Sequence, residues 1–123
     1  MYSERLLDHF QNPRNVGELP PPAATVEVVN PACGDILRLS AEVRAERVVK
    51  AGYQTRGCTA SIAAGSALTE WLIGRTMAEI AKLRTADIEE AVGGLSPESK
   101  HAAVLCVDAV RALLKQLTQG GIR

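Results

Sequence analysis

Two short loops each carry a cysteine beside a glycine, and these residues have the clearest capacity for chemistry. Cys33 lies in the segment Asn-Pro-Ala-Cys-Gly-Asp, and Asp35 follows it two residues later. Pro31 and Gly34 favour a tight turn that exposes the thiol. A thiolate and a carboxylate in such a turn offer one soft and one hard donor to the same metal ion. Cys33 and Asp35 are therefore a candidate ligand pair.

Cys58 lies where a predicted strand ends and a predicted helix begins, in the segment Thr-Arg-Gly-Cys-Thr. Backbone amides and the helix dipole at such a junction favour the thiolate form, and Arg56 adds positive charge nearby. Gly57 permits a sharp turn and the close approach of a ligand. The thiolate is the form that binds metals and attacks sulfur.

Each of these cysteines has a simpler interpretation as a small buried hydrophobic residue, and the local sequence leaves both interpretations open. The spacing between positions 33 and 58 does not match a zinc-finger pattern. Three cysteines in a chain expected in a reducing compartment also argue against a disulfide framework.

The predicted last helix carries two further candidates. Cys106 lies in the middle of its apolar stripe, so a core position is the simpler interpretation of this residue. His101 borders the same stripe near the start of the helix. Spacing alone leaves His101 open as either a ligand or a structural histidine.

The elements that must position these residues follow from periodicity and capping signals. Three short strands joined by short links imply an antiparallel sheet, and strands followed by helices imply an α+β fold with the helices on one face, as one domain over residues 1–123. The expected strands are residues 25–29, at an edge, 36–43 and 48–55. The expected helices are one from Ser3 to Gln11, one over residues 60–73, one opened by a capping box at Thr76, one capped by Thr85, and one from Ser96 and Pro97 to about residue 118.

Composition narrows the class of protein. Hydrophobic residues make up 46% of the chain, enough for a core without disulfides, and 14 basic residues balance 14 acidic ones. Since like charges form no block, we expect neither nucleic acid nor a membrane surface as a partner. No apolar run reaches the length of a membrane span, and the first ten residues lack the apolar core of a secretory signal. We therefore expect a cytoplasmic protein.

Several motifs, taken together and in order, resemble the IscU/NifU N-terminal type of iron–sulfur cluster assembly scaffold. They are residues 2–4 and 8–17, Cys33-Gly34-Asp35, Gly57-Cys58, the Leu-Thr-Glu-Trp segment at 68–71, and Asp87-Ile88. The resemblance covers nearly the whole chain without large insertions. It implies the same α+β fold, of the IscU/SufE-like type.

The resemblance also implies a function and a ligand set. Members of the family receive sulfur from a cysteine desulfurase, combine it with iron and hold a [2Fe–2S] cluster for transfer to apo iron–sulfur client proteins, and some bind zinc at the same site. The implied ligands for the cluster, iron or zinc are Cys33, Asp35, Cys58 and His101. The candidate sulfur acceptors are Cys58, Cys33 and Cys106. On this interpretation the protein is a scaffold and not an enzyme.

The chain departs from the family pattern at three places. Ala102 stands where the family has its third cysteine, a main sulfur acceptor, and Cys106 lies one helical turn further on. Residues 95–99 lack one proline and the aligned lysine of the family's chaperone-recognition motif, although Lys100 follows, so docking of an Hsp70-type chaperone is left open. The loop over residues 19–30 is shorter than usual in the family.

Two other functions remain open on the sequence. One is a zinc-dependent sulfurtransferase, in which the same four ligands hold zinc until a desulfurase delivers sulfur. The other is a zinc-stabilised adaptor that docks a desulfurase without sulfur chemistry.

Overall fold

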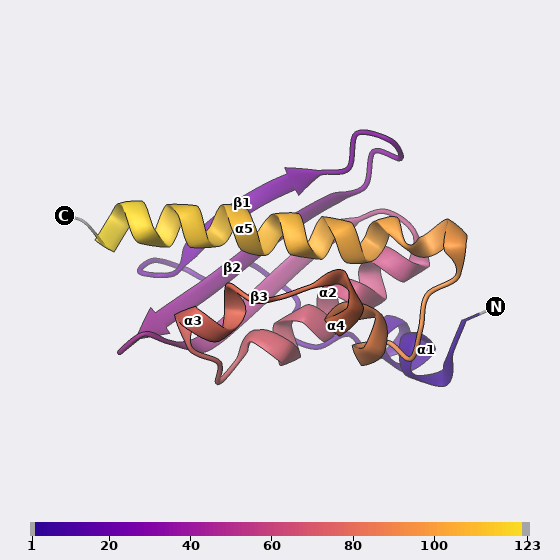
Figure 1. Cartoon of the computed structure of the whole chain (residues 1–123), viewed down its shortest axis with the longest axis horizontal. Helices are drawn as coiled ribbons and strands as arrows, with labels where there is room; N and C mark the ends of the chain where they lie inside the picture. Colours follow the sequence, from indigo (N-terminus) through magenta and orange to yellow (C-terminus); the bar gives the residue numbers. More distant parts are fainter. Residues whose placement is uncertain (1, 122–123) are drawn as a thin grey trace.

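The computed structural model describes residues 2–121 and shows a three-stranded sheet with helices on one face (Figure 1). The expected α+β fold is thereby confirmed. The elements in chain order are α1 (Glu4–Gln11), β1 (Ala24–Val29), β2 (Ile36–Arg44), β3 (Arg47–Arg56), α2 (Thr59–Leu72), α3 (Met77–Ile80), α4 (Thr85–Ala91), the 3₁₀ turn η1 (Pro97–Ser99) and α5 (His101–Gly121).

The strands pair antiparallel in the order β1-β2-β3, which places β1 at an edge as expected. Alternation along β2 directs Leu37, Leu39 and Ala41 toward the helices, and all three are fully buried. Ala45 and Glu46, both at positive φ, form the tight connection from β2 to β3. Short connections of this kind give the meander that the strand spacing predicts.

Two long helices cover the inner face of the sheet. Figure 1 shows α5 running along β1 and β2, while α2 packs against β3. The α2 helix is rich in alanine and serine, so its backbone comes close to the strand, and its one glycine, Gly65, lies against the ring of Tyr53. No helix within residues 2–121 combines the length and apolar character needed to cross a membrane.

Two predicted helix starts differ from the structure. The last helix does not run continuously from Pro97, because a 3₁₀ turn comes first and α5 begins at His101. The start of α4 is one residue earlier than predicted. The Asp87 carboxylate accepts a hydrogen bond from the Arg84 backbone amide (2.9 Å), so Arg84 and not Thr85 occupies the N-cap position. By contrast, Ser3 caps α1 and Thr76 opens α3 with a capping box, as predicted.

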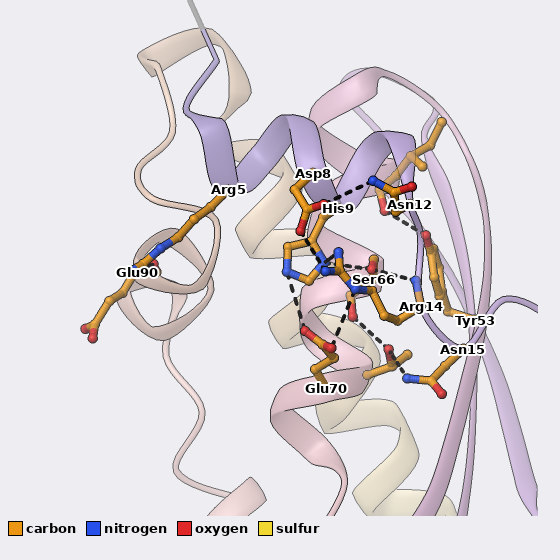
Figure 2. A network of polar contacts seen from close by, with 12 residues as sticks. Arg5, Asp8, His9, Asn12, Arg14, Asn15, Tyr53, Ser66, Glu70 and Glu90 are labelled. Carbon is orange, nitrogen blue, oxygen red and sulfur yellow. Dashed lines mark hydrogen bonds and ion pairs between the residues drawn. The ribbon is translucent and has the colours of Figure 1, made fainter.

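A buried polar network fastens α1 to α2 (Figure 2). The Ser66 side chain is fully buried and lies 2.7 Å from Nδ1 of His9, and its oxygen also accepts a hydrogen bond from the Arg14 backbone amide (2.9 Å). Glu70 lies 3.6 Å from Nε2 of His9 and pairs with Arg14 as well. The Arg14 guanidinium makes a shorter ion pair with Asp8 (2.6 Å). These contacts hold the N-terminal helix in place.

Candidate metal centre

Three parts of the fold meet at the four residues that the sequence indicated. Cys33 and Asp35 lie in the loop between β1 and β2, Cys58 immediately precedes α2, and His101 is the first residue of α5. One ligand atom from each of Cys33, Asp35 and His101 lies within 4.8 Å of the other two. The sulfur of Cys58 lies 3.6 Å from Oδ2 of Asp35 and 3.5 Å from Nε2 of His101. All four candidate ligands are therefore gathered at one place.

The loop that carries Cys33 and Asp35 is held by Asn30. The Asn30 backbone amide donates to the Asp35 carbonyl oxygen (2.8 Å), and the Gly34 amide donates to the Asn30 carbonyl oxygen (2.7 Å). The side chain of Asn30 also accepts from the amide of Ala32 (2.9 Å). Gly34 has φ of +77°, which favours glycine at this position. The turn leaves Cys33 exposed and Asp35 buried.

Cys58 occupies the N-cap position of α2, with extended backbone angles and a half-buried side chain. The residue before it must be small. A Cβ atom on Gly57 would lie 2.5 Å from Cγ of Asp35 and 2.8 Å from both of its carboxylate oxygens. Gly57 therefore serves the site by leaving room for the Asp35 carboxylate, which is a steric role beyond the sharp turn that the sequence indicated.

His101 enters the site because the 3₁₀ turn η1 redirects the chain just before α5. Its Nε2 atom lies 3.3 Å from Oδ2 of Asp35, and its side chain is 26% exposed. An imidazole nitrogen in this place can bind a metal ion or donate a hydrogen bond to the carboxylate. The structure thus places the His101 imidazole beside the Asp35 carboxylate, where both of these roles are compatible with its position.

The environment of Asp35 favours its ionised form. Burial acts to raise the pKa of Asp35, but hydrogen bonds from the Ser61 hydroxyl, the Cys58 thiol and the Cys58 backbone amide act in the opposite direction, together with the charge of His101. The net effect is a pKa below the ordinary value for an aspartate. The carboxylate is therefore available as a charged oxygen donor.

Ser61 belongs to the site although the sequence interpretation did not include it. Its hydroxyl oxygen lies 2.6 Å from Oδ2 of Asp35 and 3.4 Å from the sulfur of Cys58. The available signal was its position three residues after Cys58, because residues i and i+3 share a helix face. That signal gives the direction of the side chain but not its partner on another element.

Cys106 lies in the core and not at the site. Its side chain is 1% exposed, and burial raises the pKa of its thiol to about 12. Ala102, one helical turn earlier, is also fully buried. A buried protonated thiol is neither a good nucleophile nor a good ligand, so this position does not favour Cys106 as a sulfur acceptor.

The donor set of two thiols, one carboxylate and one imidazole determines which metals fit. Zinc takes four ligands of these types in tetrahedral sites, and iron in clusters prefers thiolates with occasional replacement by histidine. Hard cations such as Mg²⁺ prefer oxygen ligands and suit this site poorly. The residues present therefore fit zinc or iron.

Comparisons with known proteins identify the family to which the chain belongs. Residues 1–120 match the NifU-like N-terminal domain family. The chain is 39% identical over 118 residues to the iron–sulfur cluster assembly scaffold protein IscU of Azotobacter vinelandii, covering 93% of this chain and 91% of that protein. It is 37% identical over 117 residues to IscU of Escherichia coli K12, covering 92% and 91% of the two chains.

Solved structures support the same fold at lower sequence identity. A scaffold protein for the SUF system from Fervidobacterium islandicum superimposes with a TM-score of 0.75 at 20% identity, over 92% of this chain and 96% of that one. A NifU-like N-terminal domain from Brucella abortus gives a TM-score of 0.62 over 89% of this chain. The family match spans nearly the whole chain, and the identity to relatives is sustained over their length. This chain therefore belongs to the family of NifU-like N-terminal domains.

Proposed function

We propose that this protein is a scaffold on which an iron–sulfur cluster is assembled and from which it is passed to apo-proteins. The observation that carries the proposal is the meeting of Cys33, Asp35, Cys58 and His101 at one partly exposed place. These residues match the donor types that iron and zinc accept. The relatives that are named as iron–sulfur scaffolds support the same conclusion.

In this proposal iron and sulfide are the cargo, and the chain supplies ligands without catalysing a reaction of its own. Cys33, Asp35, Cys58 and His101 hold a [2Fe–2S] cluster or iron, and the same four residues hold zinc in the resting state. The partners are a cysteine desulfurase and apo iron–sulfur proteins. We also propose that residues 1–123 form a single scaffold domain.

The accessible sulfur acceptors are Cys33, which is exposed, and Cys58, which is half-buried. The thiolate of Cys33 attacks the outer sulfur of the desulfurase persulfide. One S–S bond forms at Cys33 and one breaks, and the desulfurase cysteine leaves as a thiolate, so that no external oxidant is needed. Burial of Cys106 leaves it outside this step.

Anaerobic reconstitution with iron, cysteine, a cysteine desulfurase and dithiothreitol, which supplies the electrons that reduce persulfide sulfur to sulfide, tests the proposal. We expect iron and sulfide to be bound in equal amounts, with the visible absorption of a [2Fe–2S] cluster. Cys58→Ser should abolish this absorption while its circular dichroism shows a folded protein. A wild-type chain that acquires no cluster under these conditions would contradict the scaffold function.

Asp35 supplies the hard oxygen donor in an otherwise soft site, and we infer that it makes the cluster exchangeable. Replacing Asp35 with Ala should prolong the lifetime of the cluster on the protein, because the weakest iron–ligand bond is the one removed. The measurement is the decay of cluster absorption in the presence of a chelator. An unchanged or shorter lifetime in Asp35→Ala would exclude this role of the carboxylate.

A zinc-dependent sulfurtransferase is a second candidate function. It is favoured by the close grouping of Asp35, Cys58 and His101, with separations of 3.3–3.6 Å, while Cys33 stays exposed at the rim. In that case mass spectrometry would find a persulfide on Cys33 with zinc tightly bound and no cluster. A zinc-stabilised adaptor would instead keep its function in Cys58→Ser with the fold intact.

A further inference from the structure

One buried hydroxyl lies behind the candidate ligands and connects two of them. Ser61, in the first turn of α2, is 2% exposed. Its oxygen lies 2.6 Å from Oδ2 of Asp35 and 3.4 Å from the sulfur of Cys58. Asp35 and Ser61 are 26 residues apart and belong to different elements, so this contact exists only in the folded chain.

The Ser61 hydroxyl donates its hydrogen bond to one acceptor. A serine hydroxyl carries one donor and two acceptor lone pairs. The carboxylate of Asp35 accepts only, and it is the nearer neighbour, so Ser61 donates to Asp35. The sulfur of Cys58 lies 3.4 Å from the same hydroxyl oxygen, while the thiol proton is directed to Oδ2 of Asp35, where a metal would replace it.

Besides Ser61, the hydrogen-bond donors to the Asp35 carboxylate are the Cys58 backbone amide and the Cys58 thiol, and this thiol is itself a candidate ligand. The backbone of the loop that carries Asp35 is held by Asn30, and Gly57 leaves space beside the carboxylate without fixing its orientation. Oδ2, the oxygen that Ser61 contacts, is also the one that lies 3.3 Å from Nε2 of His101. The short hydrogen bond from Ser61 therefore contributes directly to holding Oδ2 toward the other ligands.

We propose that Ser61 is a positioning residue of the metal centre, which holds Asp35 in the orientation that binds the metal. This inference rests on the proposed function, since it assumes that Asp35 is a ligand. Ser61 itself does not bind the metal. Partners of this kind typically contribute about 10- to 100-fold to metal affinity, because a free carboxylate must be ordered when the metal binds.

The test measures binding of Co²⁺ to the full chain, without a desulfurase or a cluster. Co²⁺ is a spectroscopic substitute for zinc, and its visible absorption reports the ligands and their geometry. Competition with a chelator gives the affinity. Ser61→Ala should bind Co²⁺ about 10- to 100-fold more weakly than wild type and show altered absorption bands. Ser61→Thr keeps the hydroxyl and should restore most of the affinity.

A matched control is available on the same helix. Ser66 is also a buried serine of α2, but its hydroxyl contacts His9 and the Arg14 amide, away from the ligands. Ser66→Ala should lower the melting temperature and leave Co²⁺ affinity and absorption unchanged. Equal losses of affinity in Ser61→Ala and Ser66→Ala would show a general effect of destabilising α2 and would overturn the proposal.

A double-mutant cycle separates positioning of Asp35 from an independent role of Ser61. If Ser61 acts through Asp35, adding Ser61→Ala to Asp35→Ala should cause no further loss of Co²⁺ affinity. A further loss as large as in the wild-type background would overturn the proposal, as would a Ser61→Ala variant that binds like wild type. A wild-type chain that binds no Co²⁺ would instead contradict the metal centre and the proposed function.

Discussion

At the scale of single residues, the site is organised around one carboxylate. Asp35 is reached by the Ser61 hydroxyl, the Cys58 thiol and the His101 imidazole, and the missing side chain of Gly57 makes room for it. Ser61 constrains the orientation of the carboxylate, and Cys58 places a soft ligand beside it. His101 favours its negative charge, and Gly57 leaves the space that it occupies. A change at Ser61 or Gly57, which are not ligands themselves, is therefore expected to act on metal binding through Asp35.

Cys106 gives a prediction at this scale, because its burial separates it from the other two cysteines. Under native conditions an alkylating reagent should modify Cys33 and Cys58 but not Cys106, whose thiol has a pKa of about 12 and stays protonated. Mass spectrometry of the labelled chain checks this. Cys106→Ser should lower the free energy of unfolding by about 1–3 kcal/mol, since a hydroxyl costs more free energy to bury in an apolar core than a thiol does.

The control for that prediction is Cys106→Ala, which removes the thiol without introducing a hydroxyl. It should reconstitute with iron and sulfide like wild type. Native alkylation of Cys106, or loss of the cluster in Cys106→Ala, would mean that the start of α5 opens and brings this thiol into use.

At the scale of elements, α2 serves both the candidate metal centre and the core. Its N-terminal end carries the candidate ligand Cys58 and, in the first turn, Ser61, and its middle packs against β3. The Tyr53 hydroxyl donates to the Ile62 carbonyl oxygen (2.9 Å), so the strand and the helix are joined by a hydrogen bond as well as by packing. Because the helix axis lies so close to the strand, small shifts of α2 move two residues of the site together.

Gly65→Ala tests this close packing. A Cβ atom at position 65 would lie 2.5 Å from the Tyr53 ring and 3.2 Å from the Thr55 hydroxyl, so α2 or the ring must move. Overpacking of this kind costs about 1–3 kcal/mol, whereas alanine gains about 1 kcal/mol of helix propensity. We expect a net loss of stability in urea denaturation, and weaker Co²⁺ binding because the displaced helix carries Cys58. A higher denaturation midpoint would show that the gap between α2 and β3 is wider than the structure indicates.

At the scale of the whole molecule, the N-terminal segment joins elements that lie far apart in the chain. The Ser3 hydroxyl donates to the Val92 carbonyl oxygen after α4. The backbone around residue 16 pairs with β3 at Tyr53. The Tyr53 amide donates to the Asn15 carbonyl oxygen, and the Gly17 amide donates to the Tyr53 carbonyl oxygen. Between these ends, the network around His9 fastens α1 to α2 (Figure 2). The fold therefore depends on contacts between the first and the middle parts of the chain.

His9 makes this attachment sensitive to pH. Burial lowers the pKa of His9, and the positive charge of Arg14 adds to this effect, although Glu70 and Asp8 act in the opposite direction. A guanidinium can only donate, and Arg14 lies 3.3 Å from Nδ1, so the neutral ring accepts at this atom. The folded state then binds fewer protons than the unfolded state. Stability should therefore fall as the pH decreases below about 6.5, the value expected in the unfolded chain.

The measurement is the melting temperature between pH 8 and pH 5, with His9→Gln as the control that cannot titrate. The wild type should lose more stability across this range than the variant does. Parallel curves for the two proteins would exclude His9 as the source of the pH dependence.

The sequence by itself determined the elements and the residues at their junctions. The placement of Cys33 and Asp35 between two strands, and of Cys58 between a strand and a helix, depends on turns, caps and periodicity within a few residues. These local signals also indicated the strand order, the cap at Ser3, the capping box at Thr76 and the core position of Cys106, and all of these agree with the structure.

Only the tertiary structure decided how distant side chains meet. The contact from Ser61 to Asp35, the space left by Gly57 and the approach of His101 through the 3₁₀ turn all join separate elements. Periodicity gives the face of a helix on which a residue lies, but the partner on that face depends on how the loop after β1 packs against α2 and α5. Local sequence therefore indicated Cys33, Asp35 and Cys58 as candidate ligands and the family resemblance added His101, whereas the orientation of all four side chains depends on packing.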